Sequence, residues 1–464
     1  MTDPQLPRED PPGADAVGEL AGIVGEAHVV TDPALMEQYV VDWARRWRGA
    51  AVAVVRPAST QEVSDVLRWC INHDVPVLPQ GGNTGLVGGS VPASEPPGGR
   101  APLIVSLRRM DHLGDVDHLS GQVTVGAGAT LGDVHRHAAD AGWAYGVDLA
   151  ARDSATIGGT VATNAGGIHV IAYGMTRAQV VGIEAVLPDG TVLSHLSGLL
   201  KDNTGYDLAS LLCGSEGTLG VITAVRLRLH RPEGRTTVAL IGCSSYDEAL
   251  ARMVTSVAPQ VRLLAAEVID EPGMDLACSV MGAPWPLADR HPVMTLLEVV
   301  DGGDASGLVG LDDADVAIGM DAAERARLWE FRERQGEAFS SLGVTHKLDV
   351  SVPLPVLAQC ADELRDVVAA FADVQVFGVF GHLADGNIHV EIHGPDADDD
   401  AVDLAVLACV ARHGGSISAE HGVGRAKAHE LHLTRSAAEI GAMRALKAAW
   451  DPKGLMNPGV IFSA

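Results

Sequence analysis

The stretch Pro76-VLPQGGNTGLVGGS-Val91 decides the fold of this chain. It places five glycines and an Asn-Thr pair directly after a short apolar run that is typical of a strand. Because glycine has no Cβ, the backbone N–H groups of such a loop can close on an anion. The loop lacks the Lys of a nucleoside-triphosphate P-loop. It therefore predicts an anion cradle made of backbone.

A second stretch, Asp153-SATIGGTVATNAGG-Ile168, is also rich in small residues and side-chain amides. This composition is expected where a long, flat cofactor lies against backbone. Either glycine run alone could be an ordinary turn, but the two together favour a cofactor site. Residues 177–228 then alternate as strand, turn and strand around Asp189-Gly190.

The segment Val125-GAGATLG-Asp133 invites a competing interpretation, the dinucleotide fingerprint. It follows an apolar stretch and opens a helix-like one, but its third glycine comes one residue late. A lone glycine triplet is weak evidence. We therefore expect a strand-to-helix turn here rather than a nicotinamide site.

Two segments nearer the C-terminus, Phe380-GHLADGNIH-Val390 and Ser418-AEHGVGRAK-Ala428, gather imidazoles and carboxylates. Two imidazoles and a carboxylate form a ligand set for a borderline metal, and a further His without ligand duty could move protons. The alternative, polar side chains that satisfy one another in a buried turn, is less favoured for the group as a whole. The segments predict a metal-assisted active site that contains His382, Asp385, His389, Glu420 and His421.

With these motifs the chain resembles the FAD-linked D-2-hydroxyacid dehydrogenases of the vanillyl-alcohol-oxidase-type flavoproteins, whose members include D-2-hydroxyglutarate, D-lactate and glycolate dehydrogenases. The resemblance extends from about Val29 to Phe462. It implies an α+β fold with an FAD-binding domain of two subdomains. It also implies an α+β substrate (cap) domain that contains an antiparallel sheet.

The resemblance implies where FAD binds. In the family the PQGGNTG loop wraps the pyrophosphate, the second glycine-rich segment lines the isoalloxazine, and the SEGTLG segment runs beside the ADP half. Covalently flavinylated relatives carry a His in the pyrophosphate loop, where this chain has an Asn-Thr pair, so we expect non-covalent FAD. The implied FAD-binding residues are Pro79, Gly81, Gly82, Asn83, Thr84, Gly85, Gly88, Ser154, Gly158, Gly159, Asn164, Gly167, Glu216, Gly217, Gly220 and Asn457.

The resemblance also implies the reaction, which is oxidation of a D-2-hydroxyacid to a 2-oxoacid. We expect Zn²⁺ or Mn²⁺ on His382, His389 and Glu420 to hold the substrate oxygens. His421 is expected to take the hydroxyl proton while the hydride passes to flavin N5. The electron acceptor stays open between an electron-transfer flavoprotein, a quinone and oxygen.

Four further residues are implied at the substrate. Arg332 and Lys347 match the family's carboxylate-binding pair, although helical spacing alone would favour an exposed face for Arg332. Gly336 stands where the hydroxyglutarate enzymes have a hydroxyl residue, and Glu391 where they have an Asn. Glu391 then either joins the metal ligands or faces the substrate. If Glu391 faces the substrate, we expect the protein to prefer a D-2-hydroxyacid whose side chain is uncharged or donates a hydrogen bond.

Other functions remain open on the sequence. Within the same fold the runners-up are a D-lactate or glycolate dehydrogenase, an oxidase, and a transferase similar to alkyl-glycerone-phosphate synthase. A hypothesis from another class is a flavin- and metal-binding sensor that does not turn over.

Composition narrows the class of protein. At 464 residues the chain is longer than a single hydrophobic core usually supports, which predicts two domains. Its net charge of −27 argues against nucleic acid or an anionic membrane as partner. Six cysteines without a C-x-x-C pair favour reduced thiols in a cytoplasm, and no apolar run reaches membrane-spanning length. A homodimer is the candidate assembly.

The expected organisation is a disordered acidic tail (1–14), an FAD-binding domain (15–230), a substrate or cap domain with the metal site (231–440), and a C-terminal segment that returns to the FAD domain (441–464).

Overall fold

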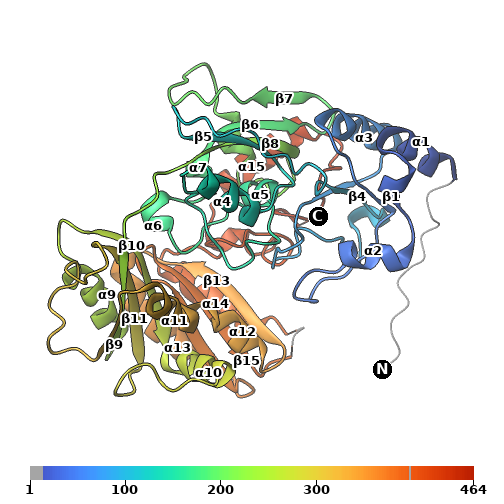
Figure 1. Cartoon of the computed structure of the whole chain (residues 1–464). Coiled ribbons are helices and arrows are strands. Elements are labelled where there is room, and N and C mark those ends of the chain that lie inside the picture. The colour runs from blue at the N-terminus through green and yellow to red at the C-terminus, as the bar shows by residue number, and fades with distance from the viewer. Residues whose placement is uncertain (1–13, 397–398, 464) are drawn as a thin grey trace. The chain divides into compact units, whose positions relative to one another are not determined.

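The computed structural model describes residues 14–396 and 399–463, and its contacts divide the chain into two compact units (Figure 1). Unit 1 consists of the chain up to Gly167, of Gly174–Arg231, and of the chain from His421 onward. Unit 2 consists of Ile168–Tyr173 and Pro232–Glu420. The predicted tail falls outside the described residues except for Ala14, which begins helix α1. The domain boundaries expected at 230/231 and 440/441 remain predictions.

The first sheet of unit 1 has the strand order β1-β2-β4-β3, in which only β1 is antiparallel to its neighbour. Because side chains alternate along a strand, Leu78 and Ile104 pack on one face, together with Tyr39 of the helix Pro33–Val40. Leu103 and Val105 point into the main core of the unit. The strands are β1 (Val29–Val30), β2 (Ala53–Val55), β3 (Val77–Gln80) and β4 (Leu103–Ser106).

The second sheet of unit 1 is antiparallel, with the order β5-β8-β6-β7. The predicted turn at Asp189-Gly190 joins β6 to β7, as expected. Val125 and Val225 of this sheet lie in the same buried cluster as Leu103 of the first, so both subdomains share one core. The strands are β5 (Gln122–Gly126), β6 (Val180–Val186), β7 (Val192–His195) and β8 (Val221–Arg228).

The helices of unit 1 begin and end where the sequence supplies caps. Helix α3 starts after Ser59, whose hydroxyl accepts from Glu62 N, and ends at Asp74 in the left-handed region. Helix α15 ends at Asp451, immediately before a proline. The α-helices are α1 (Ala14–Val24), α2 (Pro33–Val40), α3 (Thr60–His73), α4 (Leu131–Asp140), α5 (Ile157–Thr163), α7 (Thr176–Gln179), α8 (Leu208–Leu212) and α15 (Ala437–Trp450), and the 3₁₀ turns are η1 (Glu26–His28), η2 (Pro97–Gly99) and η3 (Leu431–Leu433).

The segment that resembled a dinucleotide fingerprint forms the predicted turn from β5 to α4, which Thr130 caps. Its glycines permit close backbone packing. A Cβ on Gly126 would lie 2.0 Å from the carbonyl oxygen of Met110, and one on Gly128 would lie 2.1 Å from that of Leu107. The triplet is therefore explained by the core of unit 1.

Unit 2 is built on the predicted antiparallel sheet, with the strand order β12-β9-β11-β10-β14-β15-β13. Within the described residues no helix is long and apolar enough to cross a membrane. The strands are β9 (Thr236–Cys243), β10 (Arg262–Asp270), β11 (Val293–Val300), β12 (Val316–Gly319), β13 (Thr345–Ser351), β14 (Val376–His382) and β15 (Asn387–His393). The helices are α6 (Val170–Tyr173), α9 (Tyr246–Thr255), α10 (Glu271–Met281), α11 (Ala322–Glu333), α12 (Gln335–Ser340), α13 (Leu354–Ala369) and α14 (Ala401–Arg412).

One face of this sheet changes from apolar to polar across its width. On β9 and β11 it carries Leu240 and Leu296, which pack in one buried cluster with Phe331 of α11. Toward the other edge of the sheet, on β10, β14, β15 and β13, cross-strand pairing and alternation place a row of polar residues on this same face. This row consists of Glu267, His382, Asn387, His389, Asp349, Glu391 and Lys347.

Candidate flavin cradle and metal centre

The predicted pyrophosphate loop follows β3 and is braced by two amides. Gln80 Nε2 donates to the carbonyl oxygens of Tyr39 (2.8 Å) and Ser90 (2.7 Å), which ties the two ends of the loop. Asn83, at φ 57°, donates from Nδ2 to Val41 O (2.8 Å) and accepts from the Ser90 hydroxyl (2.9 Å). The side chain of Asn83 therefore shapes the loop from within.

The loop fits an anionic group. Among the described residues, none of the N–H groups of residues 83–89 donates to a backbone carbonyl. A run of unpaired N–H groups in a glycine-rich turn is what a pyrophosphate requires. This geometry is consistent with the anion cradle, and the role of the loop at the FAD pyrophosphate remains a prediction.

The second glycine-rich segment packs directly on this loop. A Cβ on Gly81 would lie 2.2 Å from Thr156 Oγ1, and one on Gly82 would lie 2.0 Å from Ser154 O. Gly158 approaches Ala127 equally closely, with 2.7 Å between the two Cβ positions. These glycines let separate backbone segments meet, and any larger residue would force them apart.

Glu216 and Asn457 join two more segments to the cradle. The carboxylate of Glu216 accepts from the backbone N–H groups of Val423 (2.8 Å) and Gly424 (2.9 Å), and burial raises its pKa to about 7. Asn457 Nδ2 donates to Gly89 O (3.0 Å) and Glu216 O (2.8 Å), whereas its buried Oδ1 has no protein partner. An orphaned buried amide oxygen beside the loop is consistent with a group bound there.

The remaining predicted FAD residues also lie in unit 1. Asn164 ends α5 in the left-handed region and accepts from Arg177 N (2.9 Å), and Gly217 lies against Pro79. Their contacts to FAD remain predictions, as do those of Thr84, Gly85, Gly88, Gly159, Gly167 and Gly220.

FAD should be released into the supernatant when the protein is precipitated with acid or heat. The loop that would carry the covalent link holds no His, since residues 81–89 read GGNTGLVGG. The flavin absorbance of the supernatant and pellet measures the outcome. Flavin retained by the denatured pellet would show a covalent bond and contradict the prediction.

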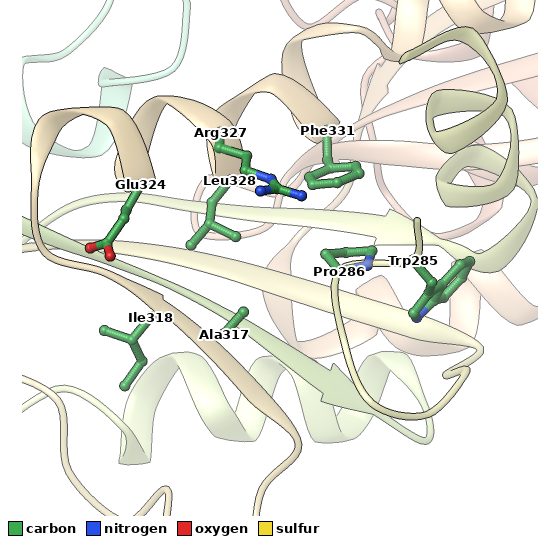
Figure 2. A pocket seen from close by; sticks show the side chains of 8 residues that line it. All are labelled: Trp285, Pro286, Ala317, Ile318, Glu324, Arg327, Leu328 and Phe331. Atoms are coloured by element: carbon green, nitrogen blue, oxygen red, sulfur yellow. The ribbon is translucent and has the colours of Figure 1, made fainter. Parts of the chain in front are cut away.

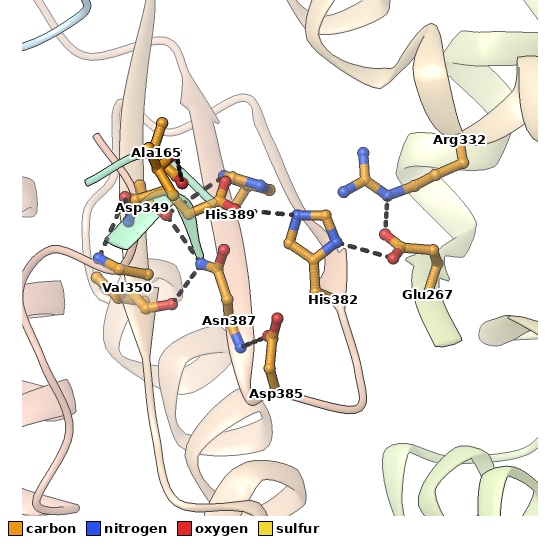
Figure 3. Close-up of polar contacts among 12 residues, drawn as sticks. Ala165, Glu267, Arg332, Asp349, Val350, His382, Asp385, Asn387 and His389 are labelled. Carbon is orange, nitrogen blue, oxygen red and sulfur yellow. Dashed lines mark hydrogen bonds and ion pairs between the residues drawn. The ribbon is translucent and has the colours of Figure 1, made fainter. Parts of the chain in front are cut away.

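The three predicted metal ligands lie close together in unit 2. Figure 3 labels His382 and His389, the two imidazoles of this group. His382 ends β14, His389 lies on the neighbouring strand β15, and Glu420 ends the unit. One ligand atom from each lies within 4.8 Å of the others, and His382 Nε2 is 3.6 Å from Glu420 Oε1. The side chain of Asp385 instead accepts a hydrogen bond from Asn387 N (3.0 Å) in the turn between β14 and β15.

A buried chain that the sequence did not predict orients His382 (Figure 3). Glu267 accepts from His382 Nδ1 (2.8 Å) through one oxygen and from Arg332 Nε (2.7 Å) through the other. With Nδ1 engaged, Nε2 is left as the ligand atom. Burial lowers the pKa of His382, but the carboxylates of Glu267 and Glu420 outweigh burial and raise it to about 10. This excess of negative charge suits a cation.

Asp349 is the second residue that the sequence did not reveal. It is fully buried and accepts from Asn387 Nδ2 (2.8 Å) and from the N–H groups of Ala419 (3.2 Å) and Glu420 (2.7 Å). Its Oδ1 lies 3.8 Å from His389 Nδ1. Asp349 therefore holds the backbone of one candidate ligand and lies beside the ring of another. A lone carboxylate in an apolar strand, as in residues 263–269 (LLAAEVI), is the signal that could have identified Glu267.

The four predicted substrate residues separate into two groups. Arg332 is 8 % exposed and bound to Glu267, so the exposed-face interpretation is wrong for it. Lys347 Nζ donates to Gly336 O (3.3 Å) and lies 3.5 Å from Glu391 Oε1. Glu391 is buried, which raises its pKa to about 7, and its Oε2 has no protein partner. The roles of all four at a substrate remain predictions.

A separate hollow in unit 2 contains none of the predicted site residues (Figure 2). It is largely apolar, with one acidic and one basic side chain. Its lining is Trp285, Pro286, Ala317, Ile318, Glu324, Arg327, Leu328 and Phe331.

Glu267→Gln should weaken binding of Zn²⁺ or Mn²⁺ by about 10–100-fold, because the carboxylate that orients a metal-binding His contributes this much to affinity. Glutamine keeps the shape and can still accept one hydrogen bond. Equilibrium dialysis with metal analysis measures the change. Glu271→Gln, at an exposed ion pair with Arg290, is the matched control. Equal affinity in both variants would remove Glu267 from the site.

Both halves of the chain match known families. Residues 51–195 match the family described as FAD binding domain, and residues 232–461 match the C-terminal domain of FAD linked oxidases. Two solved structures share the fold at low identity. Alkyldihydroxyacetonephosphate synthase has a TM-score of 0.72 and 17 % identity over 98 % of this chain and 87 % of that one. p-Cresol methylhydroxylase has a TM-score of 0.73 and 15 % identity over 97 % and 96 %.

Several relatives are similar over almost the whole chain. The mitochondrial D-2-hydroxyglutarate dehydrogenase of Bos taurus is 38 % identical over 93 % of this chain and 80 % of its own length. The D-2-hydroxyglutarate dehydrogenase of Xanthomonas citri pv. viticola is 37 % identical over 93 % of each chain. A putative mitochondrial D-lactate dehydrogenase of Schizosaccharomyces pombe is 34 % identical over 95 % of this chain and 88 % of its own length. The chain therefore belongs to the FAD-linked oxidase family with the vanillyl-alcohol-oxidase-type fold, and it is an FAD-dependent oxidoreductase.

Proposed function

We propose that this flavoprotein oxidises a D-2-hydroxyacid to the 2-oxoacid with the help of a divalent metal ion. The observation that carries the proposal is the convergence of His382, His389 and Glu420 within 4.8 Å on the polar face of unit 2. The names of the relatives support it, since they are enzymes of D-2-hydroxyglutarate and D-lactate.

The donor set fits Zn²⁺ or Mn²⁺, because two imidazoles and a carboxylate leave coordination positions open for substrate. When bound, such an ion supplies the Lewis acidity that lowers the pKa of a substrate hydroxyl. Glu267 fixes which nitrogen of His382 faces the ion, and Asp349 holds the backbone of Glu420. The protein thus presents a preorganised site.

In this proposal His421 accepts the proton of the substrate hydroxyl, and FAD, when bound, would supply the acceptor for the α-hydrogen as hydride. Lys347 and the terminal nitrogens of Arg332 would bind substrate carboxylate, since only Arg332 Nε is used by Glu267. An electron-transfer flavoprotein or a quinone would serve as the electron acceptor. The six free cysteines agree with a reducing compartment, and we propose a cytoplasmic homodimer.

Anaerobic mixing with a panel of D- and L-2-hydroxyacids tests the reaction. We expect the flavin absorbance to bleach with D-acids only. Bleaching by neither enantiomer would overturn the proposal in favour of a sensor or a transferase. Oxygen uptake at the same rate in air would identify an oxidase instead.

Glu391→Asn combined with Gly336→Thr should raise the specificity constant for D-2-hydroxyglutarate relative to D-lactate by about 100-fold. The Glu391 carboxylate pairs with Lys347 and would repel the distal carboxylate of D-2-hydroxyglutarate. Like charges in a closed site cost several kcal/mol. A Cβ at Gly336 meets nothing within 4 Å, so the threonine has room. Steady-state kinetics measure the ratio, with Glu337→Gln on the exposed side of α12 as control.

The discrimination by Glu391 against a dicarboxylate substrate should depend on pH. The raised pKa of Glu391, about 7, makes its carboxyl group neutral below this pH and ionised above it. Discrimination against the dicarboxylate should therefore grow as pH rises through 7, and the double variant should lose this dependence. An unmodified protein that already prefers D-2-hydroxyglutarate far above D-lactate and D-malate would show that Glu391 is not a filter.

A further inference from the structure

Helices α13 and α14 of unit 2 pack together and bring two buried thiols and an imidazole to one point. Cys360 lies on α13, Cys409 on α14, and His413 directly follows α14. The two sulfurs and one ring nitrogen lie within 4.8 Å of one another. Both cysteines are fully buried, and the His413 side chain is 9 % exposed.

The helical spacing and a carboxylate orient these groups. Cys409 and His413 are four residues apart and so lie on one side of the helix end. On α13, Glu363 lies three residues after Cys360 and accepts from His413 Nε2 (2.7 Å). A carboxylate that receives one N–H of an imidazole is the usual partner of a metal-binding His.

Charge and size also fit a thiophilic divalent ion. Two thiolates and a neutral imidazole balance a charge of +2 inside the protein. Tetrahedral zinc places sulfur ligands roughly 3.7 Å apart. This separation is inside the 4.8 Å limit within which the three donor atoms lie.

We propose that Cys360, Cys409 and His413 bind a Zn²⁺ ion that ties α13 to α14, with Glu363 orienting the imidazole and water in the fourth position. The site shares no residue with His382, His389 and Glu420. Because α13 contacts β14 and α14 contacts β13, the ion stabilises the scaffold of the polar face.

The site can be tested by titrating Co²⁺ into the protein with FAD bound and its cysteines reduced. Thiolate ligands produce a sulfur-to-cobalt charge-transfer band in the difference spectrum. The candidate active-site donors are all nitrogen and oxygen, so the band reports the second site alone. We expect it in the unmodified protein and in Cys243→Ala, a buried cysteine elsewhere in the unit. It should be lost in Cys360→Ala/Cys409→Ala.

Two further variants keep the thiols in place. His413→Asn should weaken Co²⁺ binding, and Glu363→Gln should weaken it by about 10–100-fold. Absence of the band from the unmodified protein, or its persistence in the double variant, would overturn the proposal. Detection of a Cys360–Cys409 disulfide in the native protein by mass spectrometry would also overturn it.

Discussion

Removing the divalent metal ion should lower oxidation of a D-2-hydroxyacid by about three orders of magnitude or more while FAD stays bound. In the proposed reaction the ion would lower the pKa of the substrate hydroxyl, so its removal would cost several kcal/mol of transition-state stabilisation. Dialysis against a chelator, followed by turnover and flavin absorbance, measures both effects. Added Zn²⁺ or Mn²⁺ should restore activity.

His389→Ala should reproduce the effect of the chelator, and His393→Ala is its matched control. Both residues lie on the same face of β15, but His393 is turned to Val344 O (3.0 Å) and is outside the ligand group. Purified protein that holds no divalent metal and ignores the chelator would contradict the assignment of His382, His389 and Glu420.

His421→Ala should lose about three orders of magnitude in turnover and keep its metal. Removal of a general base from an active site costs 10²–10⁴-fold, roughly, because water must take the proton instead. Rapid-quench kinetics with metal analysis on the same sample distinguish a base from a ligand.

His432→Ala, an exposed His in the part of unit 1 that begins at His421, should be without effect. Loss of metal from His421→Ala would make His421 a ligand. Unchanged turnover in that variant would place the base elsewhere.

The sequence predicted the flavin domain because its evidence is local. A backbone cradle needs glycine at consecutive positions, as at Gly81 and Gly82, whatever the rest of the chain does. The convergence of His382 and His389 was also predictable, because both belong to one hairpin whose register pairs β14 with β15.

The partners of these residues could not be predicted in the same way. Glu267 lies 115 residues before His382, and Arg332 lies 65 residues after Glu267. Period-2 alternation shows which face a side chain is on, but it does not show which strands are neighbours. The register of β10 with β14 decided that Glu267 meets His382. The packing of α11 on the sheet decided that Arg332 holds Glu267, a contact that neither the helical spacing nor the family resemblance had indicated.

The sequence by itself therefore predicted a long cofactor on glycine-rich backbone and a group of candidate metal ligands, since each is carried by residues a few positions apart. The family resemblance added FAD and the antiparallel sheet of unit 2. Only the tertiary structure decided what surrounds those ligands and where Glu391 points. It paired Glu391 with Lys347, and it brought Cys360 to Cys409 across two helices. The physical reason is that burial and charge pairing depend on neighbours in space, which strand order and helix packing supply and local patterns do not record.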